Sequence, residues 1–458
     1  MDKIFEYSIS YPIIRHPLAN EKEQVKLKYA SLLKLYSAKF FESHAVIAMR
    51  TERFINDFLN GKQLNSAAQS DAASDILKTR FTPFRFFSYR YIFLFDCVFL
   101  FTPTNKGKAQ KICDELKATV NQRYHKQLDE IIRMMFEDDS KLIKSAAITA
   151  EQFEAWERLR RFAETKEKGI VFTATMSAGK STLINALIGQ DVSNAKKAAC
   201  TSKILHFYSS AMPHTVFNLV SERNEIVNIP SEKVRNILTT DNNNYAVIGY
   251  FFSKLSEAKY CLIDTPGVDS FLNPDHKLIT RNILGAKEHD VIVYVIPVES
   301  YGSESDYYHL KYILEKVKFK QIVFVINMID TCNFEDDSIA EIIDDVRSHL
   351  EDIGYKMPLI CPMSAKAGFL LKQSITGQRL GPASKELART FCDMFYEDEF
   401  DLSCYYKDVL GNTIEFFPPR KINYSFDIPI EKLQKAYEHT GLPQFEKIIK
   451  KMVVSSNL

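Results

Sequence analysis

The chain has 458 residues, more than one hydrophobic core usually holds, so two or three domains are expected. Its 59 Lys and Arg are balanced by 58 Asp and Glu, which excludes the basic surplus typical of nucleic-acid binding. Eight cysteines without a C-x-x-C pair argue against a zinc site or a disulfide framework, and the chain start lacks a secretion signal. We therefore expect a cytoplasmic protein without a nucleic-acid partner.

The first third of the chain predicts helices. Apolar residues recur at three- and four-residue steps from 20 to 60, which indicates one long helix, and similar spacing predicts a second over 103–135. A third helix is expected to begin at Thr149, where Thr149-x-x-Gln152 forms a capping box. Amphipathic helices bury their apolar stripes against each other, so residues 1–165 are predicted to form a helical bundle.

The longest apolar run of the chain is Tyr91 to Phe101, with the sequence YIFLFDCVFLF. It is too short to cross a bilayer, and Asp96 lies in its middle. A buried helix or strand is therefore the favoured interpretation. A membrane-touching element is the alternative that this stretch leaves open.

From Ile170 onward, apolar strands alternate with amphipathic helices. This alternation predicts an α/β domain over residues 166–385, with a mainly parallel sheet covered by helices on both faces. Ligands of such sheets bind beyond the carboxyl ends of the strands. Residues 386–458 are predicted to form an aromatic insertion and a C-terminal helix that packs on this domain or on the bundle. The candidate strands are 170–173, 204–208, 216–220, 261–263, 291–296, 322–326 and 359–362.

The segment from Ile170 to Thr182 runs from an apolar strand through small residues into a helix, which is the layout of a phosphate-binding loop. The pattern G-x-x-x-x-G-K-[ST] begins here with Ala174, whose β-carbon would cost about 1–2 kcal/mol if the position requires a positive φ. Unpaired N–H groups at the helix start would face a triphosphate, which Lys180 would also reach. The predicted phosphate-binding residues are Ser177, Ala178, Gly179, Lys180, Ser181 and Thr182.

A second motif, Asp264-Thr265-Pro266-Gly267, follows the candidate strand 261–263. Asp264 can hold a Mg²⁺-bound water, and the N–H of Gly267 can meet a γ-phosphate. Thr201 lies between the phosphate loop and this motif, where its hydroxyl would bind Mg²⁺ and its carbonyl would lie near an attacking water. The predicted metal residues are Ser181, Thr201 and Asp264.

Two further motifs follow the next strands and suit a purine base. The carboxylate of Asp330, in Asn327-x-x-Asp330, can accept hydrogen bonds from the N1–H and 2-amino group of guanine, and adenine lacks that pair of donors. A backbone N–H of Ser364-Ala365-Lys366 can meet the guanine O6. Because the motifs occur in this order at strand ends, the sequence predicts a site for GTP with Mg²⁺ in a P-loop GTPase fold.

With these motifs the chain resembles the dynamin superfamily of large GTPases, most nearly its bacterial dynamin-like members, over about Ile170 to Lys372. The resemblance is carried by the loop Thr175–Thr182, by Thr201 and by Asp264–Gly267. The spacing of about 80 residues between the loop lysine and D-T-P-G exceeds that of Ras-like GTPases. The stretch Gly441 to Ile449 also resembles the helix that closes such a GTPase domain.

The resemblance implies hydrolysis of GTP to GDP and phosphate, coupled to movement of switch segments around Thr201 and Gly267 and to pairing of GTPase domains. It also implies self-association and a helical neck, and it leaves a peripheral membrane contact open. The long helical stalk that usually follows the GTPase domain is either missing here or replaced by the N-terminal helices.

Catalysis in this resemblance would rest on positioning and charge, because Met176 stands where many eukaryotic members have a glutamine that orients water. A monovalent cation near Ser177 is left open as a further contributor. The predicted catalytic residues are Ser177, Lys180, Thr201 and Gly267.

A GTP-binding regulatory or scaffold protein with negligible turnover is the alternative function. It is motivated by Ala174, by Met176, and by Met328, which replaces the lysine that usually lies over the guanine face.

Overall fold

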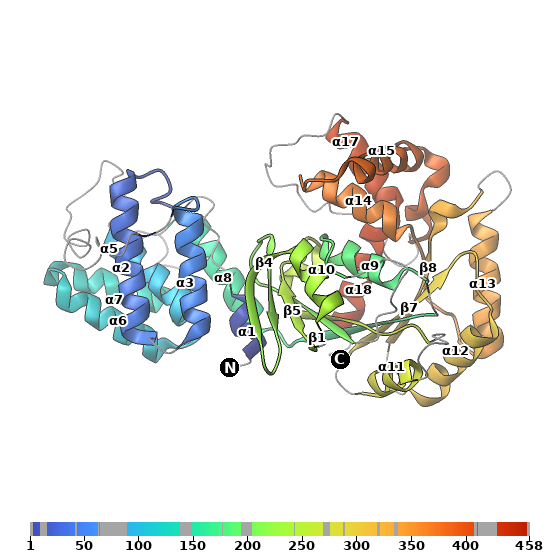
Figure 1. Ribbon diagram of the computed structural model, residues 1–458, viewed down its shortest axis with the longest axis horizontal. Coiled ribbons are helices and arrows are strands. Elements are labelled where there is room, and N and C mark those ends of the chain that lie inside the picture. Colours follow the sequence, from blue (N-terminus) through green and yellow to red (C-terminus); the bar gives the residue numbers. More distant parts are fainter. Residues whose placement is uncertain are drawn as a thin grey trace. The chain divides into compact units, whose positions relative to one another are not determined.

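The computed structural model describes residues 3–9, 16–41, 44–62, 64, 89–137, 149–175, 177–193, 204–241, 243–268, 275–286, 289–317, 321–333, 338–406, 410 and 428–455. By its contacts the chain divides into two units. The first is Met1–Thr165 with Ser210–His214, and the second is Lys166–Ser209 with Thr215–Leu458. Figure 1 labels their elements.

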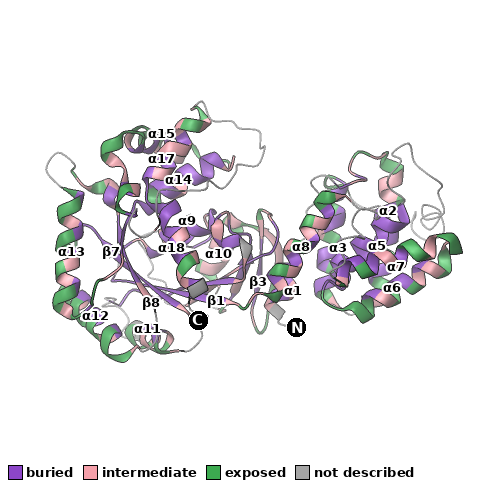
Figure 2. Cartoon of the chain, turned by 180° about the vertical axis from the view of Figure 1, so that it is seen from behind, coloured by how far each residue is buried: buried purple, intermediate pink, exposed green. Residues whose placement is uncertain are grey.

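The first unit is a bundle of helices around α5 (Tyr89–Phe101), as the apolar spacing predicts. α5 contacts α2, α3, α6 and α7, whose buried positions face one another within the bundle (Figure 2). The remaining elements of this unit are α1 (Lys3–Ser8), α2 (Glu23–Phe41), α3 (Ala45–Phe58), α6 (Lys106–Thr119), the 3₁₀ helix η2 (Gln122–Tyr124), α7 (His125–Phe136) and α8 (Ala150–Glu164).

Two of the predicted long helices are wrong, because each is a pair of shorter ones. Residues 20–60 form α2 and α3, and residues 103–135 form α6 and α7, with Asn105 as the N-cap of α6. Apolar spacing reports burial, and both helices of each pair bury a face against α5, so the spacing continues across the break. The capping box at Thr149 is confirmed: its hydroxyl accepts from the backbone N–H of Gln152 at 3.1 Å.

The aromatic run is the core of this unit. All 13 residues of α5 are buried, which confirms the interpretation as a buried element. The carboxylate of Asp96 is accommodated because Tyr29 donates to it at 2.5 Å and His16 Nε2 lies 2.9 Å away. Among the described residues, no helix has the length and apolar character needed to span a bilayer.

The second unit is an α/β fold built on one nine-stranded sheet with the order β4-β3-β5-β2-β6-β1-β7-β8-β9. The half from β6 to β9 is parallel, whereas β2 runs antiparallel to β6, and β3 runs antiparallel to both β4 and β5. The strands are β1 (Lys168–Thr173), β2 (Leu205–Ser209), β3 (Val216–Val220), β4 (Glu225–Pro230), β5 (Ala246–Gly249), β6 (Tyr260–Asp264), β7 (Val291–Pro297), β8 (Gln321–Asn327) and β9 (Ile360–Pro362).

The predicted strands are all present, but β4 and β5 were not predicted. β4 is an edge strand whose residues are half-buried or exposed, and β5 has only four residues, so neither carries a strong apolar signal. In the parallel half, β6, β1, β7, β8 and β9 end at the same edge of the sheet. The motifs that follow β1, β6, β8 and β9 therefore meet at that edge.

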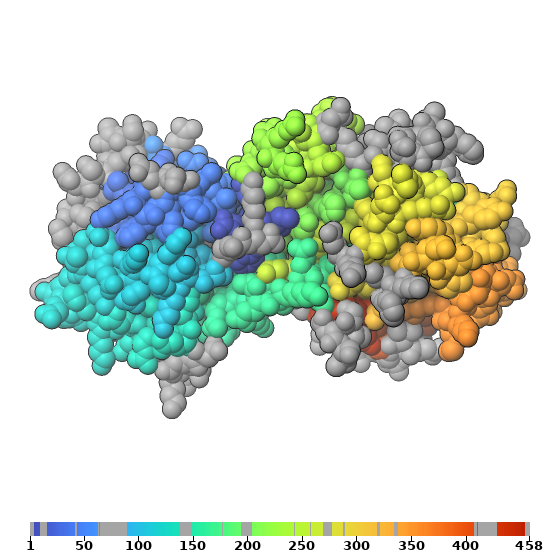
Figure 3. Space-filling view, turned by 90° about the horizontal axis from the view of Figure 1, so that it is seen from below, coloured from blue at the N-terminus to red at the C-terminus, as the bar shows by residue number. Residues whose placement is uncertain are grey.

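Helices cover the sheet on both sides. Figure 1 shows α9, α14 and α18 on one side of β7 and β8, and α11 and α12 on the other, and α11 to α13 share one surface in Figure 3. The helices are α9 (Lys180–Ile188), α10 (Ser231–Thr240), α11 (Asp275–Gly285), α12 (Glu304–Lys316), α13 (Ile339–Ile353), α14 (Ala365–Ile375), α15 (Pro382–Tyr396), α17 (Ile430–His439) and α18 (Leu442–Ser455). The 3₁₀ helices are η3 (Lys254–Glu257), η4 (Ile329–Thr331), η5 (Asp398–Phe400) and η6 (Leu402–Tyr406).

The described residues beyond 385 belong to the same unit as the sheet. α15 packs on α14 and α17, while α18 contacts η3 and β7. The aromatic stretch Phe416–Pro419, which the sequence suggests as an insertion, lies outside the described residues.

Candidate nucleotide site

The phosphate loop joins β1 to α9. Ala174 is fully buried and is not among the residues with positive φ, so its β-carbon causes none of the strain that a glycine position would imply. The left-handed conformations fall instead at Ser177, with φ 65°, and at Gly179, with φ 85°. The substitution of Ala for the first loop glycine is therefore compatible with this loop.

Gly179 is required for a second reason besides its φ. A β-carbon at this position would lie 2.4 Å from Nδ2 of Asn327, which is closer than atoms pack. The loop and the segment after β8 can approach one another only because this residue has no side chain.

Asp264 and Ser181 lie together at the ends of β6 and of the loop. Both are positioned by backbone elements, and Ser181 Oγ donates to Asp264 Oδ2 at 2.9 Å. Ser193 Oγ donates to the same oxygen at 3.1 Å. The other carboxylate oxygen, Oδ1, is buried and has no partner among the described residues.

These oxygens fit a Mg²⁺ ion, which binds through hydroxyl, carboxylate and water oxygens. Burial raises the pKa of the Asp264 carboxyl, and the positive charge of Lys180 and the hydroxyls of Ser181 and Ser193 offset part of that rise. A cation beside Oδ1 would also satisfy a buried atom that otherwise lacks a partner. Thr201, the third predicted metal residue, lies outside the described residues, as does Met176.

The D-T-P-G segment is attached to the start of the phosphate loop. Thr265 Oγ1 donates to the carbonyl of Phe172 at 2.8 Å, and the N–H of Val268 donates to the carbonyl of Ala174 at 3.4 Å. Gly267 lies between these two contacts and is buried. Thr280 Oγ1 of α11 also donates to the carbonyl of Pro266 at 3.0 Å, so the segment is held at Thr265 and Pro266 and, by a longer hydrogen bond, at Val268.

The predicted base-binding residues converge on the same edge. Asn327 Nδ2 donates to the carbonyl of Ala178 at 3.0 Å, and Asn327 Oδ1 accepts from the N–H of Ala365 at 3.0 Å. Ser364 Oγ donates to Asp330 Oδ1 at 2.5 Å. Asn327 therefore joins the phosphate loop to the loop after β9, while Ser364 orients the Asp330 carboxylate.

The remaining predicted residues lie around this core. Thr182 is half-buried in the first turn of α9, and Lys366 is exposed in the first turn of α14. Met328 has a left-handed φ of 69°, and its Cε would lie 3.3 Å from a β-carbon on Gly179. Its thioether side chain therefore lies beside the phosphate loop.

A buried histidine lies behind the loop. Nε2 of His309 is 2.8 Å from Oγ1 of Thr173, the last residue of β1. Burial, together with the positive charges of Arg281, Lys180 and Lys277, lowers the pKa of His309 from 6.5 to about 3. The ring is therefore neutral at pH 7.

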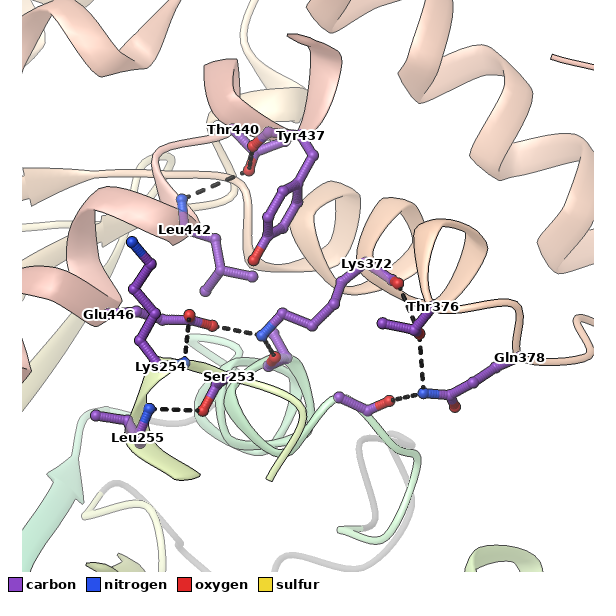
Figure 4. A network of polar contacts seen from close by, with 12 residues as sticks. Ser253, Lys254, Leu255, Lys372, Thr376, Gln378, Tyr437, Thr440, Leu442 and Glu446 are labelled. Carbon is purple, nitrogen blue, oxygen red and sulfur yellow. Dashed lines mark hydrogen bonds and ion pairs between the residues drawn. The ribbon is translucent and has the colours of Figure 1, made fainter. Parts of the chain in front are cut away.

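Sequence reasoning did not find the network that supports the site from the opposite end of α9. Lys372 Nζ donates to the carbonyl of Ala186 at 2.6 Å and pairs with Glu446, whose Oε2 accepts from the N–H of Lys254 at 3.3 Å (Figure 4). Burial lowers the pKa of Lys372, and the charge of Glu446 opposes that shift. A lone lysine and a lone glutamate give no signal in the sequence that they form a pair.

The turn between α17 and α18 supports the loop after β9. The carbonyl of Thr440 accepts from the N–H of Ser364 at 3.1 Å. Gly441 has φ 78°, and a β-carbon there would lie 2.4 Å from the carbonyl oxygen of Pro362. The predicted closing helix therefore begins at a turn that contacts the loop after β9.

Comparison with protein families gives a match to the dynamin family over residues 170–329. The stretch from β1 to η4 is therefore similar to the dynamin family. This confirms the resemblance that the motifs suggested, and it places the phosphate loop, Asp264 and Asn327 inside the matched region. No curated protein matches the chain.

The chain is also similar to several solved structures. The chain is 20% identical to Era, crystallised with MgGDPNP and nucleotides of 16S ribosomal RNA, with TM-score 0.26, and the match covers 44% of this chain and 52% of Era. It is 17% identical to the G domain of the T. maritima FeoB iron transporter, with TM-score 0.25, covering 44% of this chain and 89% of that one. It is 12% identical to a member of an oligomerised bacterial dynamin pair described as sensing and tethering membranes, with TM-score 0.35. That match covers 85% of this chain and 59% of the other. The chain thus spans about half the length of the Era protein that it matches.

Proposed function

We propose that this chain binds GTP with Mg²⁺ and hydrolyses it to GDP and phosphate, and that hydrolysis is coupled to movement of the segments around Thr201 and Gly267. One observation carries the proposal. Asn327 bonds both Ala178 of the phosphate loop and Ala365 of the loop after β9, so phosphate and base recognition share one rigid centre.

The guanine base is the ligand that this centre suits. Ser364 holds one oxygen of Asp330, which leaves the carboxylate oriented to accept the paired donors of guanine. Ala365 donates its N–H to Asn327, and Ser364 donates its own to Thr440, so the base loop is held from two sides.

In the proposed reaction, Lys180 stabilises the charge that develops on the β- and γ-phosphates, and the N–H of Gly267 binds the γ-phosphate. Ser181, Asp264 and Thr201 would hold Mg²⁺, which would neutralise negative charge on the phosphates. The carbonyl of Thr201 orients the attacking water, and no side-chain base is required.

Loss of the γ-phosphate would release Gly267. The hydrogen bond from Val268 to Ala174 is long at 3.4 Å, and it is the contact that we expect to break when this segment moves. Pairing of two GTPase domains, which would complete the site, is part of the proposal.

Fluorescent GTP and ATP analogues test the binding half of the proposal. The chain should bind the GTP analogue at least tenfold more tightly, and Lys180→Ala should abolish binding. Equal affinity for the two analogues, or binding that survives Lys180→Ala, contradicts the proposal.

Phosphate release under saturating GTP separates hydrolysis from the alternative function. Turnover per chain that rises with protein concentration supports a GTPase activated by pairing. Tight GTP binding with no release at any concentration supports a regulatory or scaffold protein instead, for which Met328 beside the phosphate loop is the structural argument.

A further inference from the structure

The strongest unassigned feature of the site is the hydroxyl of Ser193, a fully buried residue outside the predicted motifs. It donates to Asp264 Oδ2 at 3.1 Å, and Ser181 donates to the same oxygen at 2.9 Å. Asp264 Oδ1 keeps no partner among the described residues. The two hydroxyls therefore fix one carboxylate oxygen and leave the other available.

Resting on the proposed function, we infer that Ser193 is a positioning residue for magnesium: it holds Asp264 so that Oδ1 faces the ion and its bound water. Ser181 donates to the same oxygen but is itself a proposed magnesium ligand, whereas the hydroxyl of Ser193 serves Asp264 alone. A second donor on Oδ2 removes the remaining rotation of the carboxylate and stabilises its charged form.

Ser193 is itself held rigidly by Asn185, which lies on α9 one turn beyond Ser181. Asn185 Oδ1 accepts from the N–H of Ser193 at 2.8 Å and from that of Val192 at 3.0 Å, and Asn185 Nδ2 donates to the carbonyl of Ser193 at 2.9 Å. These contacts use only the backbone of Ser193. The hydroxyl of Ser193 therefore takes no part in the contacts that hold this loop.

The outer end of this segment is also anchored. Asp191 accepts from Asn185 Nδ2 at 3.2 Å and forms an ion pair with Arg235 of α10. The loop therefore keeps its path when the Ser193 hydroxyl is removed, and a substitution there reports on Asp264 rather than on loop folding.

The test uses the full chain and a fluorescent GDP titrated with MgCl₂, and a parallel titration in EDTA. Ser193→Ala should raise the Mg²⁺ concentration that half-saturates the metal-dependent increase in GDP affinity by about 10- to 100-fold. Affinity in EDTA should stay within about twofold, because without the ion the orientation of Oδ1 does not matter. Ser193→Cys keeps a side chain of similar size with a weaker donor. Its half-saturating Mg²⁺ concentration should lie between those of the unaltered chain and Ser193→Ala.

Ser374→Ala is the matched control. Ser374 is equally buried on α14, and its hydroxyl donates only to the carbonyl of Leu370, at 2.9 Å, so the Mg²⁺ dependence should be that of the unaltered chain. Thermal unfolding of each variant without nucleotide establishes that it is folded.

The outcomes are distinct. An unchanged Mg²⁺ dependence in both Ser193 variants overturns the inference, and so does an equal loss of affinity with and without Mg²⁺, which would make Ser193 a structural residue only. An unaltered chain that binds no guanine nucleotide overturns the proposed function and this inference with it.

Discussion

The side-chain amide of Asn327 donates to the carbonyl of Ala178 at 3.0 Å, across 149 residues of sequence. The same side chain accepts from the N–H of Ala365. Asn327, at the end of β8, therefore joins the loop after β1 to the loop after β9. Gly179 lies directly beside it, with no room for a side chain. This contact therefore joins the predicted phosphate-binding loop to the predicted base-binding loops.

Gly179→Ala tests how tightly the phosphate loop is packed. Its β-carbon would meet Asn327 at 2.4 Å in a left-handed conformation, so we expect destabilisation by at least about 1–2 kcal/mol and loss of nucleotide binding. Fluorescent-nucleotide titration and urea unfolding measure the two effects. Gly285→Ala, where nothing lies within 4 Å, is the control and should bind normally.

The buried Lys372–Glu446 pair is expected to stabilise the second unit. Glu446→Gln leaves the ammonium of Lys372 buried without its counter-charge, which typically costs about 3–5 kcal/mol. Urea unfolding followed by circular dichroism measures the loss. A double variant, Lys372→Met with Glu446→Gln, should recover part of it, and equal losses in the single and double variants would contradict this account.

Trp156, the only tryptophan of the sequence, gives an internal control for that experiment, because it lies in the first unit and packs on Phe95 and Phe99 of α5. Its fluorescence transition in urea therefore reports the unfolding of the first unit, for comparison with the circular dichroism of the Lys372 and Glu446 variants.

Gly441→Ala is expected to disturb base recognition. The added β-carbon would displace the carbonyl of Pro362, 2.4 Å away, and with it the loop that presents Ser364 to Asp330. We expect the preference for GTP over ATP analogues to fall by at least tenfold. Unchanged discrimination would show that the α17–α18 turn does not position this loop.

His309 predicts a loss of stability in acid. Its pKa is about 3 in the native state and 6.5 without the burial, so between these values the unfolded state binds the extra proton. The contribution of His309 to the free energy of unfolding is therefore present above pH 6.5 and is lost as the pH drops toward 3. The free energy of unfolding should fall by about 1–2 kcal/mol between pH 7 and 5. Urea unfolding at both pH values should show a smaller difference for His309→Gln, and an identical difference would exclude this histidine as the cause.

Asp96 should be essential to the helical bundle despite being an acid in an aromatic helix. Asp96→Val removes the acceptor of Tyr29 and the partner of His16. The free energy of unfolding of the bundle should fall by about 1–3 kcal/mol for each buried group that loses its partner. Trp156 fluorescence in urea reports this loss. A variant as stable as the unaltered chain would mean that the aromatic packing alone holds α5.

The sequence by itself determined the class of fold and located the motifs that are proposed to bind the nucleotide. Those signals are local: an apolar strand, a turn residue and a helix start lie within about ten residues of each other, and turn chemistry restricts which residues occur there. The Thr149 capping box was predicted for the same reason. The break between α2 and α3 was not predicted. The spacing of apolar residues indicates burial against α5, and this spacing continues across the break.

Only the tertiary structure showed which distant polar residues contact one another around the candidate site. Ser193 and Asp264 are 71 residues apart and Lys372 and Glu446 are 74 apart, and no residue type or spacing marks either pair in advance. The tertiary structure also showed that the non-glycine loop residue with a positive φ is Ser177 and not Ala174. Hydrogen bonds between distant segments depend on sheet order and register, which arise from the packing of the whole unit rather than from any one stretch of it.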